Sequence, residues 1–130
     1  MTMLREHALG AMARAYAPYS HFRVGAALLG SDGSVTEGCN VENASYPAGM
    51  CAERGAVAAA VARGVHAFEA LAIATEADEP TPPCGICRQV LEEFAPRLLI
   101  ISMTRGGRES RWTLDELLPA AFTPQSMDRR

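Results

Sequence analysis

The chain lacks lysine altogether: its 12 basic residues are all arginines, and 15 acidic residues outnumber them over 130 positions. The formal net charge is therefore −3. Proteins gain most of their affinity for polynucleotides by neutralising phosphates with cationic side chains. This charge balance argues against nucleic acid as the main partner, although a local arginine patch stays open.

Long apolar runs are also absent. The longest apolar stretches, Gly55–Ala62 and Leu98–Met103, fall far short of the ~20 residues that cross a bilayer. Near the N-terminus, Arg5 and Glu6 stand in an amphipathic pattern, without the apolar segment and cleavage site of a signal peptide. We therefore expect a cytoplasmic protein with no membrane partner.

The remaining composition is that of an ordinary globular protein. Hydrophobic residues make up 48% of the chain and charged residues 21%, so there is enough apolar material for a core. A length of 130 residues suits one compact domain. We expect a single domain over residues 1–124, followed by a polar, frayed tail at residues 125–130.

Hydrophobic periodicity and turn residues predict alternating helices and strands. The predicted helices are residues 4–15, 51–63, 84–94 and 113–118, and the predicted strands are residues 22–29, 34–42, 68–75, 98–103 and 108–112. Thr113 and Glu116 have the spacing of a capping box at the start of the last helix. The order α-β-β-α-β-α-β-β-α predicts an α/β protein in which helices pack against a mixed sheet.

Four cysteines in a cytosolic chain indicate metal binding or catalysis more than disulfides. Cys84 and Cys87 follow two prolines and open a helix, so their sulfurs lie one turn apart and can bind a single ion. A helix N-terminus also lowers the pKa of a thiol. The less favoured alternatives for this C-x-x-C pair are a redox pair, or two cysteines with no common role.

Cys51 also opens a predicted helix, so two helix N-termini can bring three thiolates to one Zn²⁺ ion. Three protein ligands leave one position for water, as in catalytic zinc sites, whereas structural sites are closed by four. Glu53 lies in the same first turn as Cys51, where its carboxylate could reach that water. The alternative for Glu53 is a surface residue favoured by the helix dipole.

These motifs together match a known signature. Cys51-Ala52-Glu53 and Pro83-Cys84-Gly85-Ile86-Cys87 have the pattern of zinc nucleobase deaminases in its all-cysteine form. The similarity continues over residues 17–28, 40–46 and 87–91, and extends from the first helix to Phe122. The chain resembles cytidine deaminases of the small, homotetrameric class.

The resemblance implies a cytidine-deaminase-like three-layer α/β fold, with a five-stranded mixed sheet and helices on both faces. It implies hydrolytic deamination of cytidine and 2′-deoxycytidine to uridine and 2′-deoxyuridine, with release of ammonia, in pyrimidine salvage. One zinc ion per subunit would be held by Cys51, Cys84 and Cys87. Zinc makes water a nucleophile near neutral pH, and Glu53 would carry the protons.

The resemblance also assigns residues to the substrate, a small nucleoside. Asn40 and Glu42 share one face of a strand and would bind the 3′-hydroxyl of the ribose. Phe22 would pack against the pyrimidine, its alternative being a plain core residue. The backbone amide of Ala52 would contact the base, and Phe122 would enter the site of a neighbouring subunit.

Two further residues have a role in the family. Three thiolates leave a negatively charged zinc centre, and Arg54 would withdraw part of that charge; its alternative is a surface arginine. Tyr46 would join the network between subunits of a homotetramer, its alternative being a buried tyrosine with one satisfied hydroxyl. The chain departs from the family pattern at Gly55, where threonine is common, and at Thr123, where glycine often stands.

Several rival functions stay open. Cys39 lies on the strand face opposite Asn40, so we expect a small buried hydrophobe. If Cys39 closed a four-cysteine site instead, the chain would be a non-catalytic zinc module. The rival enzyme is a deaminase of another aminated cytosine nucleoside such as blasticidin S, although the segment Asn40–Tyr46 favours a plain nucleoside. A transfer-RNA deaminase fits less well, because the chain is acidic and lacks that branch's histidine ligand.

Overall fold

The computed structural model describes residues 1–127. Its elements are α1 (Thr2–Met12), β1 (Val24–Gly30), β2 (Val35–Cys39), the 3-10 turn η1 (Tyr46–Ala48), α2 (Ala52–Ala62), β3 (Phe68–Thr75), α3 (Gly85–Phe94), β4 (Leu99–Thr104), β5 (Glu109–Thr113), α4 (Leu114–Leu117) and α5 (Pro124–Met127). The predicted order of helices and strands is confirmed, and the capping box of Thr113 and Glu116 is present. Within residues 1–127, no helix has the length and apolar character to cross a membrane.

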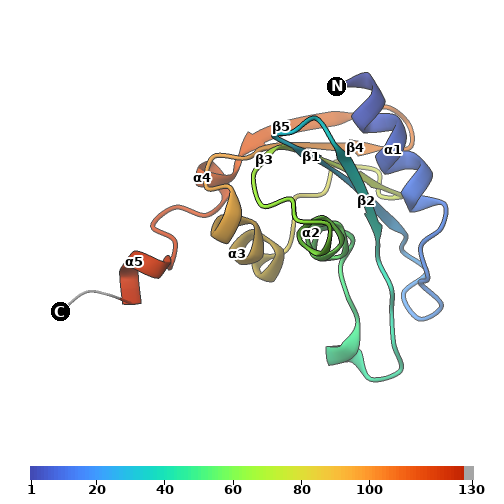
Figure 1. The fold of residues 1–130 in the computed structure, drawn as a ribbon. Coiled ribbons are helices and arrows are strands. Elements are labelled where there is room, and N and C mark those ends of the chain that lie inside the picture. Colours follow the sequence, from blue (N-terminus) through green and yellow to red (C-terminus); the bar gives the residue numbers. More distant parts are fainter. Residues whose placement is uncertain (128–130) are drawn as a thin grey trace.

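The two short elements η1 and α5 are not evident from the sequence pattern. The predicted polar tail at residues 125–130 begins within α5, which lies away from the sheet (Figure 1). Residues 128–130 lie outside the described part of the chain. The end of α1 at Met12 is also earlier than the periodicity predicts.

The strands form one five-stranded sheet in the order β2-β1-β3-β4-β5. Only β3 and β4 are parallel, with Ala72 opposite Ile101, and the other neighbouring strands are antiparallel. Parallel neighbours need a crossover connection, which here contains α3. The sheet is therefore mixed, as predicted.

Helices cover both faces of this sheet (Figure 1). On one face α1 packs on small side chains, among them Ala27, Ala72 and Ala74. On the opposite face α2, α3 and α4 pack on larger ones, including Leu71 and Ile73. Because successive strand residues point to opposite faces, β3 contributes side chains to the hydrophobic clusters on both faces of the sheet. The predicted three-layer fold is confirmed.

Gly38 sets how closely β2 approaches the first turn of α2. A Cβ atom at this position would lie 2.3 Å from the carbonyl oxygen of Ala52 and 2.5 Å from the nitrogen of Ala56. Both of those atoms belong to helix backbone and cannot move aside as a flexible side chain would. A residue without a side chain thus lets the N-terminus of α2, and with it Cys51, lie directly against the sheet.

We therefore predict that Gly38→Ala lowers the free energy of unfolding by about 1–3 kcal/mol, the usual cost of overpacking. Gly10→Ala is the matched control, because Gly10 lies in α1 with no atom near the added methyl group. That change should raise the free energy of unfolding by about 0.5–1 kcal/mol, since alanine favours a helix. Denaturant titration measures both values, and shifts of the same sign would contradict the packing argument.

Candidate active site

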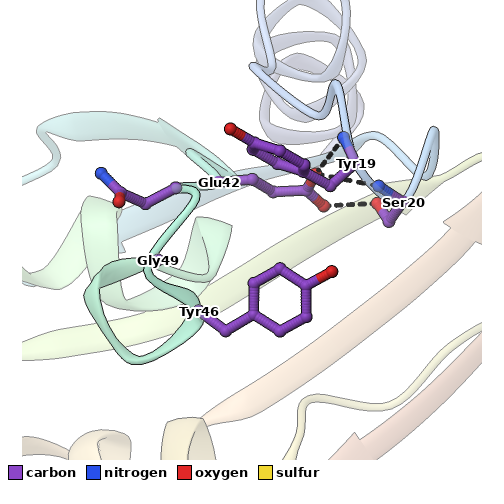
Figure 2. Close-up of a pocket in the computed structure, with 6 residues that line it drawn as sticks. Tyr19, Ser20, Glu42, Tyr46 and Gly49 are labelled. Carbon is purple, nitrogen blue, oxygen red and sulfur yellow. Dashed lines mark hydrogen bonds between the residues drawn. The ribbon is translucent and has the colours of Figure 1, made fainter.

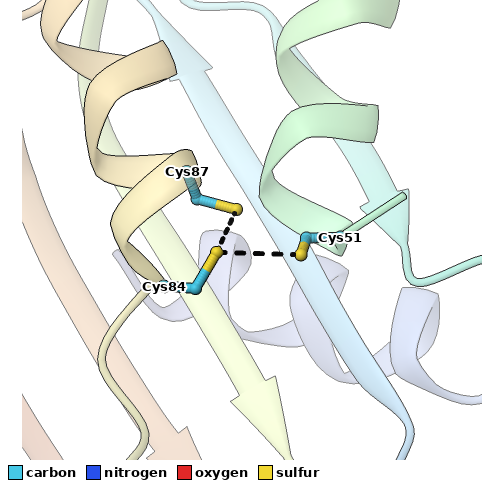
Figure 3. Close-up of side chains that lie close together, drawn as sticks. All are labelled: Cys51, Cys84 and Cys87. Carbon is cyan, nitrogen blue, oxygen red and sulfur yellow. Dashed lines mark hydrogen bonds between the residues drawn. The ribbon is translucent and has the colours of Figure 1, made fainter. Parts of the chain in front are cut away.

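The three predicted zinc-binding cysteines meet between the beginnings of two helices. Cys51 is the N-cap of α2 and Cys84 the N-cap of α3, both with extended backbone, and Cys87 lies in the first turn of α3. Figure 3 shows the three sulfur atoms pointing into the space between these helices. The expectation that two helix N-termini converge is confirmed.

The distances between the sulfur atoms suit one metal ion. The Sγ atom of Cys84 lies 3.9 Å from that of Cys51 and 3.3 Å from that of Cys87. All three lie within 4.8 Å of one another. Tetrahedral zinc with Zn–S bonds of ~2.3 Å separates its thiolates by ~3.8 Å. The donor set therefore fits zinc and leaves one of four positions without a protein ligand.

Cys39 does not belong to this cluster. Its Sγ atom donates to the carbonyl oxygen of Arg14, in the turn after α1, at 3.7 Å. The idea that Cys39 closes a four-cysteine structural site is therefore wrong. Cys39 is half-buried rather than fully buried as expected, because β2 is an edge strand of the sheet.

Cys51 and Cys87 differ in how strongly they hold a proton. A hydrogen bond from the Cys87 thiol lowers the pKa of Cys51 to about 5, and Arg54 contributes in the same direction. The same hydrogen bond, together with burial, raises the pKa of Cys87. Zinc binding replaces thiol protons, so the affinity of this site for zinc rises with pH.

Arg54 lies against the sulfur cluster and not on the open surface. Its Nη2 atom is 3.7 Å from the Sγ atom of Cys51. Its Nε atom is buried and has no hydrogen-bond partner in the described part of the chain. The Cys51 thiolate raises the pKa of the guanidinium further, so a fixed positive charge adjoins the thiolates.

Glu53 is buried, with 6% of its surface exposed, which excludes the alternative of a surface residue. Burial raises the pKa of Glu53 to about 7, and the nearby Cys51 thiolate adds to the shift. No side chain among residues 1–127 donates a hydrogen bond to its carboxylate. A carboxyl group in this state can both accept and release a proton near neutral pH.

A cavity of about 280 Å³ opens beside the sulfur cluster, and Cys51, Cys84 and Glu53 form part of its wall. Four residues that the resemblance assigns to substrate also line it: Phe22, Asn40, Glu42 and Ala52. Nothing in the sequence pattern singles out the other lining residues: Ser20, Val24, Ile73, Thr75, Thr81 and Pro82. They are ordinary strand and loop residues, so only their packing brings them to the cavity.

Asn40 and Glu42 form part of the wall of this cavity. The side chain of Asn40 accepts from the Val24 amide and donates to the Phe22 carbonyl, both at 2.8 Å. Asn40 thereby holds the chain that presents Phe22. The backbone amides of Tyr19 and Ser20 donate to Glu42 at 3.0 Å, and the Ser20 hydroxyl donates as well (Figure 2).

These hydrogen bonds set the charge of Glu42. The Ser20 hydrogen bonds lower the pKa of Glu42, so the group is a carboxylate at neutral pH. Glu42 is half-buried, because it follows the end of an edge strand. A second cavity of about 300 Å³ adjoins it, between Tyr19 and Tyr46 (Figure 2).

Two aromatic residues that the resemblance assigns to subunit contacts do not reach the first cavity. Phe122 is 61% exposed and Tyr46 is 77% exposed. The alternative of a buried Tyr46 is therefore wrong.

The two departures from the family pattern also lie outside the cavity. Gly55 has room for a Cβ atom at ordinary contact distances, and the Thr123 amide donates to the Ser126 hydroxyl at 3.1 Å.

The fold and the three-sulfur site define a zinc-binding deaminase domain, and comparison with known proteins identifies the family. The family model described as the cytidine and deoxycytidylate deaminase zinc-binding region matches residues 2–103. The chain therefore belongs to this family of zinc-dependent enzymes, and the resemblance seen in the sequence is confirmed.

Individual relatives match nearly the whole chain. A cytidine deaminase of Halalkalibacterium halodurans is 45% identical over 127 residues, covering 97% of this chain and 96% of that protein. A cytidine deaminase of Mycobacterium tuberculosis is 44% identical over 127 residues, covering 98% and 92%. The crystal structure of cytidine deaminase from Burkholderia pseudomallei superposes with a TM-score of 0.90 at 46% identity, covering 93% of this chain and 98% of that chain.

The geometry predicts different results for two cysteine variants. Cys84→Ala removes one of three ligands, and we expect it to lose most of the zinc that the unaltered protein carries. Cys39→Ala should keep its full zinc content, because Cys39 lies outside the cluster. Metal analysis of the purified proteins checks both. A fully metallated Cys84→Ala protein would refute the ligand assignment.

Proposed function

We propose that this protein catalyses the hydrolytic deamination of cytidine and 2′-deoxycytidine to uridine and 2′-deoxyuridine, with release of ammonia. One observation carries the proposal: the buried carboxyl group of Glu53 shares a nucleoside-sized cavity wall with two of the three clustered cysteines. The names of the relatives described above support the same substrate class. We assign the reaction to pyrimidine salvage in the cytoplasm.

Glu53 acts as the proton carrier in this mechanism. When zinc is bound by Cys51, Cys84 and Cys87, it supplies the Lewis acidity that makes water a nucleophile near neutral pH. The Glu53 carboxylate accepts a proton from the attacking water and passes it to ring N3 as the new C–O bond forms at C4. It then moves the second proton from that oxygen to the 4-amino group. The C4–N bond breaks, ammonia leaves, and the 4-oxo product keeps its proton on N3.

Arg54 offsets the charge of the thiolates. Three thiolates would leave a divalent ion in a net negative centre, which weakens it as a Lewis acid. The Arg54 guanidinium lies at hydrogen-bond distance from Cys51 and withdraws electron density from that sulfur. Burial raises the pKa of its neighbour Glu53 to about 7, and the Cys51 thiolate adds to that shift.

The remaining cavity residues orient the nucleoside. Phe22 packs against the pyrimidine, and the Ala52 backbone amide contacts the base. Asn40 and Glu42, which line the same cavity, hold the 3′-hydroxyl of the ribose. The bonds of Asn40 to Phe22 and Val24 link the two parts of this binding site.

The active protein is proposed to be a homotetramer in which Phe122 enters the site of a neighbouring subunit. The exposure of Phe122 and Tyr46, both large apolar side chains, supports this role. The segment that carries Phe122 leads into α5, which lies away from the sheet (Figure 1). No nucleic-acid partner is proposed.

Replacing Glu53 with Gln preserves the shape of the side chain but removes the proton carrier. We predict a fall in kcat of at least ~10²-fold, with unchanged zinc content. The loss of ultraviolet absorbance as cytidine is converted measures the rate. Parallel assays with 2′-deoxycytidine, cytosine and blasticidin S identify the substrate class, and turnover of blasticidin S alone would overturn the assignment to plain nucleosides.

Glu42→Ala should affect nucleosides far more than the free base, because only a nucleoside offers a ribose hydroxyl to the carboxylate. Hydrogen bonds to charged groups contribute about 1.5–3 kcal/mol, so kcat/KM for cytidine should fall ~10- to 150-fold. Any activity on cytosine should stay within about 3-fold. Glu69→Ala, at an exposed position on β3, is the control and should alter neither. Equal losses on both substrates would indicate a folding defect instead.

A further inference from the structure

The loop that carries Cys84 is held by its carbonyl groups. Pro82 and Pro83 precede Cys84 and have no N–H to donate, so the loop cannot be fixed by its own amides. Instead, the Ser102 hydroxyl donates to the Thr81 carbonyl at 2.7 Å. Arg88 Nε donates to the carbonyl of Pro83 at 2.8 Å, immediately before the ligand.

Arg88 joins this loop to a second element. Its Nη1 atom donates to the carbonyl of Leu117, the last residue of α4, at 2.9 Å. A cation at a helix C-terminus is also favoured by the helix dipole. Arg88 itself follows Cys87 in α3, so one guanidinium connects the helix of one ligand to the loop of another and to α4.

Cys84 is the ligand that most needs such support. Cys87 is fully buried and Cys51 is half-buried, so packing restricts both of them. Cys84 is exposed, and little packing around its own side chain fixes its position. The carbonyl of the preceding residue is thus the point at which its backbone is held.

We propose that Arg88 is a positioning residue for the metal centre: by binding the Pro83 and Leu117 carbonyls together, it fixes the backbone that presents Cys84 to zinc. The proposal rests on Cys84 being a zinc ligand, as described above. Arg88 acts on the site through the backbone that it holds. Within residues 1–127 it makes no hydrogen bond to a sulfur atom, whereas Arg54 does. Two donors of one planar guanidinium are needed, which a lysine cannot supply in that arrangement.

A purely structural role for Arg88 makes a different prediction. The Pro83 side chain is fully buried, so Arg88 could simply satisfy a carbonyl in the core and stabilise the fold. In that case its loss would lower the Tm of the zinc-free and zinc-loaded protein equally. If Arg88 positions the ligand, its loss also reduces the gain in Tm that zinc produces, because that gain reports zinc affinity.

The experiment compares the unaltered protein with Arg88→Ala, Arg88→Lys and Gln89→Ala. Gln89 is the matched control: it neighbours Arg88 and donates to the Phe122 carbonyl at 2.8 Å, so it contacts the C-terminal segment but not the Cys84 loop. The readouts are the Tm with and without zinc and the rate of zinc transfer to the chelator 4-(2-pyridylazo)resorcinol. Neither readout depends on deaminase activity.

We expect Arg88→Ala to speed zinc transfer ~10- to 100-fold, the usual effect of losing a partner that orients a metal ligand, and to shrink the zinc-induced gain in Tm. Arg88→Lys should lie between, and Gln89→Ala should match the unaltered protein. Should Arg88→Ala fail to fold, an unchanged transfer rate in Arg88→Lys would overturn the proposal. Equal Tm losses with and without zinc would overturn it too. A zinc-loaded protein without activity on cytidine would instead overturn the proposed function alone.

Discussion

Three cysteine sulfurs meet between the first turns of α2 and α3, within 4.8 Å of one another, and this juxtaposition of negative charge constrains much of the fold. Thiolates this close repel one another unless positive charge offsets them. Two helix N-termini supply part of that charge, Arg54 supplies more, and a zinc ion completes it. Both helices must therefore lie side by side on one face of the sheet, with their N-termini aligned. Gly38 permits this for α2, because only a residue without Cβ lets β2 approach the helix backbone so closely.

The two faces of the sheet have separate tasks. Small alanines under α1 build a packed layer without polar chemistry, whereas the face under α2 and α3 combines larger apolar residues with the site. Glu53 shows the consequence for chemistry. Its burial among those helices raises its pKa to about 7, a value that a surface carboxyl group does not reach. The apolar packing that stabilises the fold therefore also raises the pKa of Glu53 to a value suited to proton transfer.

All basic side chains of this protein are arginines, and several of them make contacts that a lysine could not make. Arg88 binds two carbonyl groups at once, and Arg54 directs its guanidinium to a sulfur. Arg23, the residue after Phe22, donates to the two carboxylate oxygens of Glu76 through two guanidinium nitrogens. Each of these contacts uses the forked geometry or the permanent charge of a guanidinium. A lysine offers a single point of positive charge and would reproduce none of them fully.

The sequence by itself determined the element order, the mixed sheet and the three cysteine ligands, because periodicity and helix N-cap positions are local properties of the chain. It also separated Cys39 from the ligands, since strand alternation places it on the face opposite Asn40. Only the tertiary structure decided that Glu42 is half-buried in the cavity wall, that Asn40 holds Phe22 and Val24, and that Arg88 joins Pro83 to Leu117. The hydrogen bonds of Asn40, and that of Arg88 to Leu117, join residues 16 to 29 positions apart in the chain, and no local pattern records which distant segments will pack together.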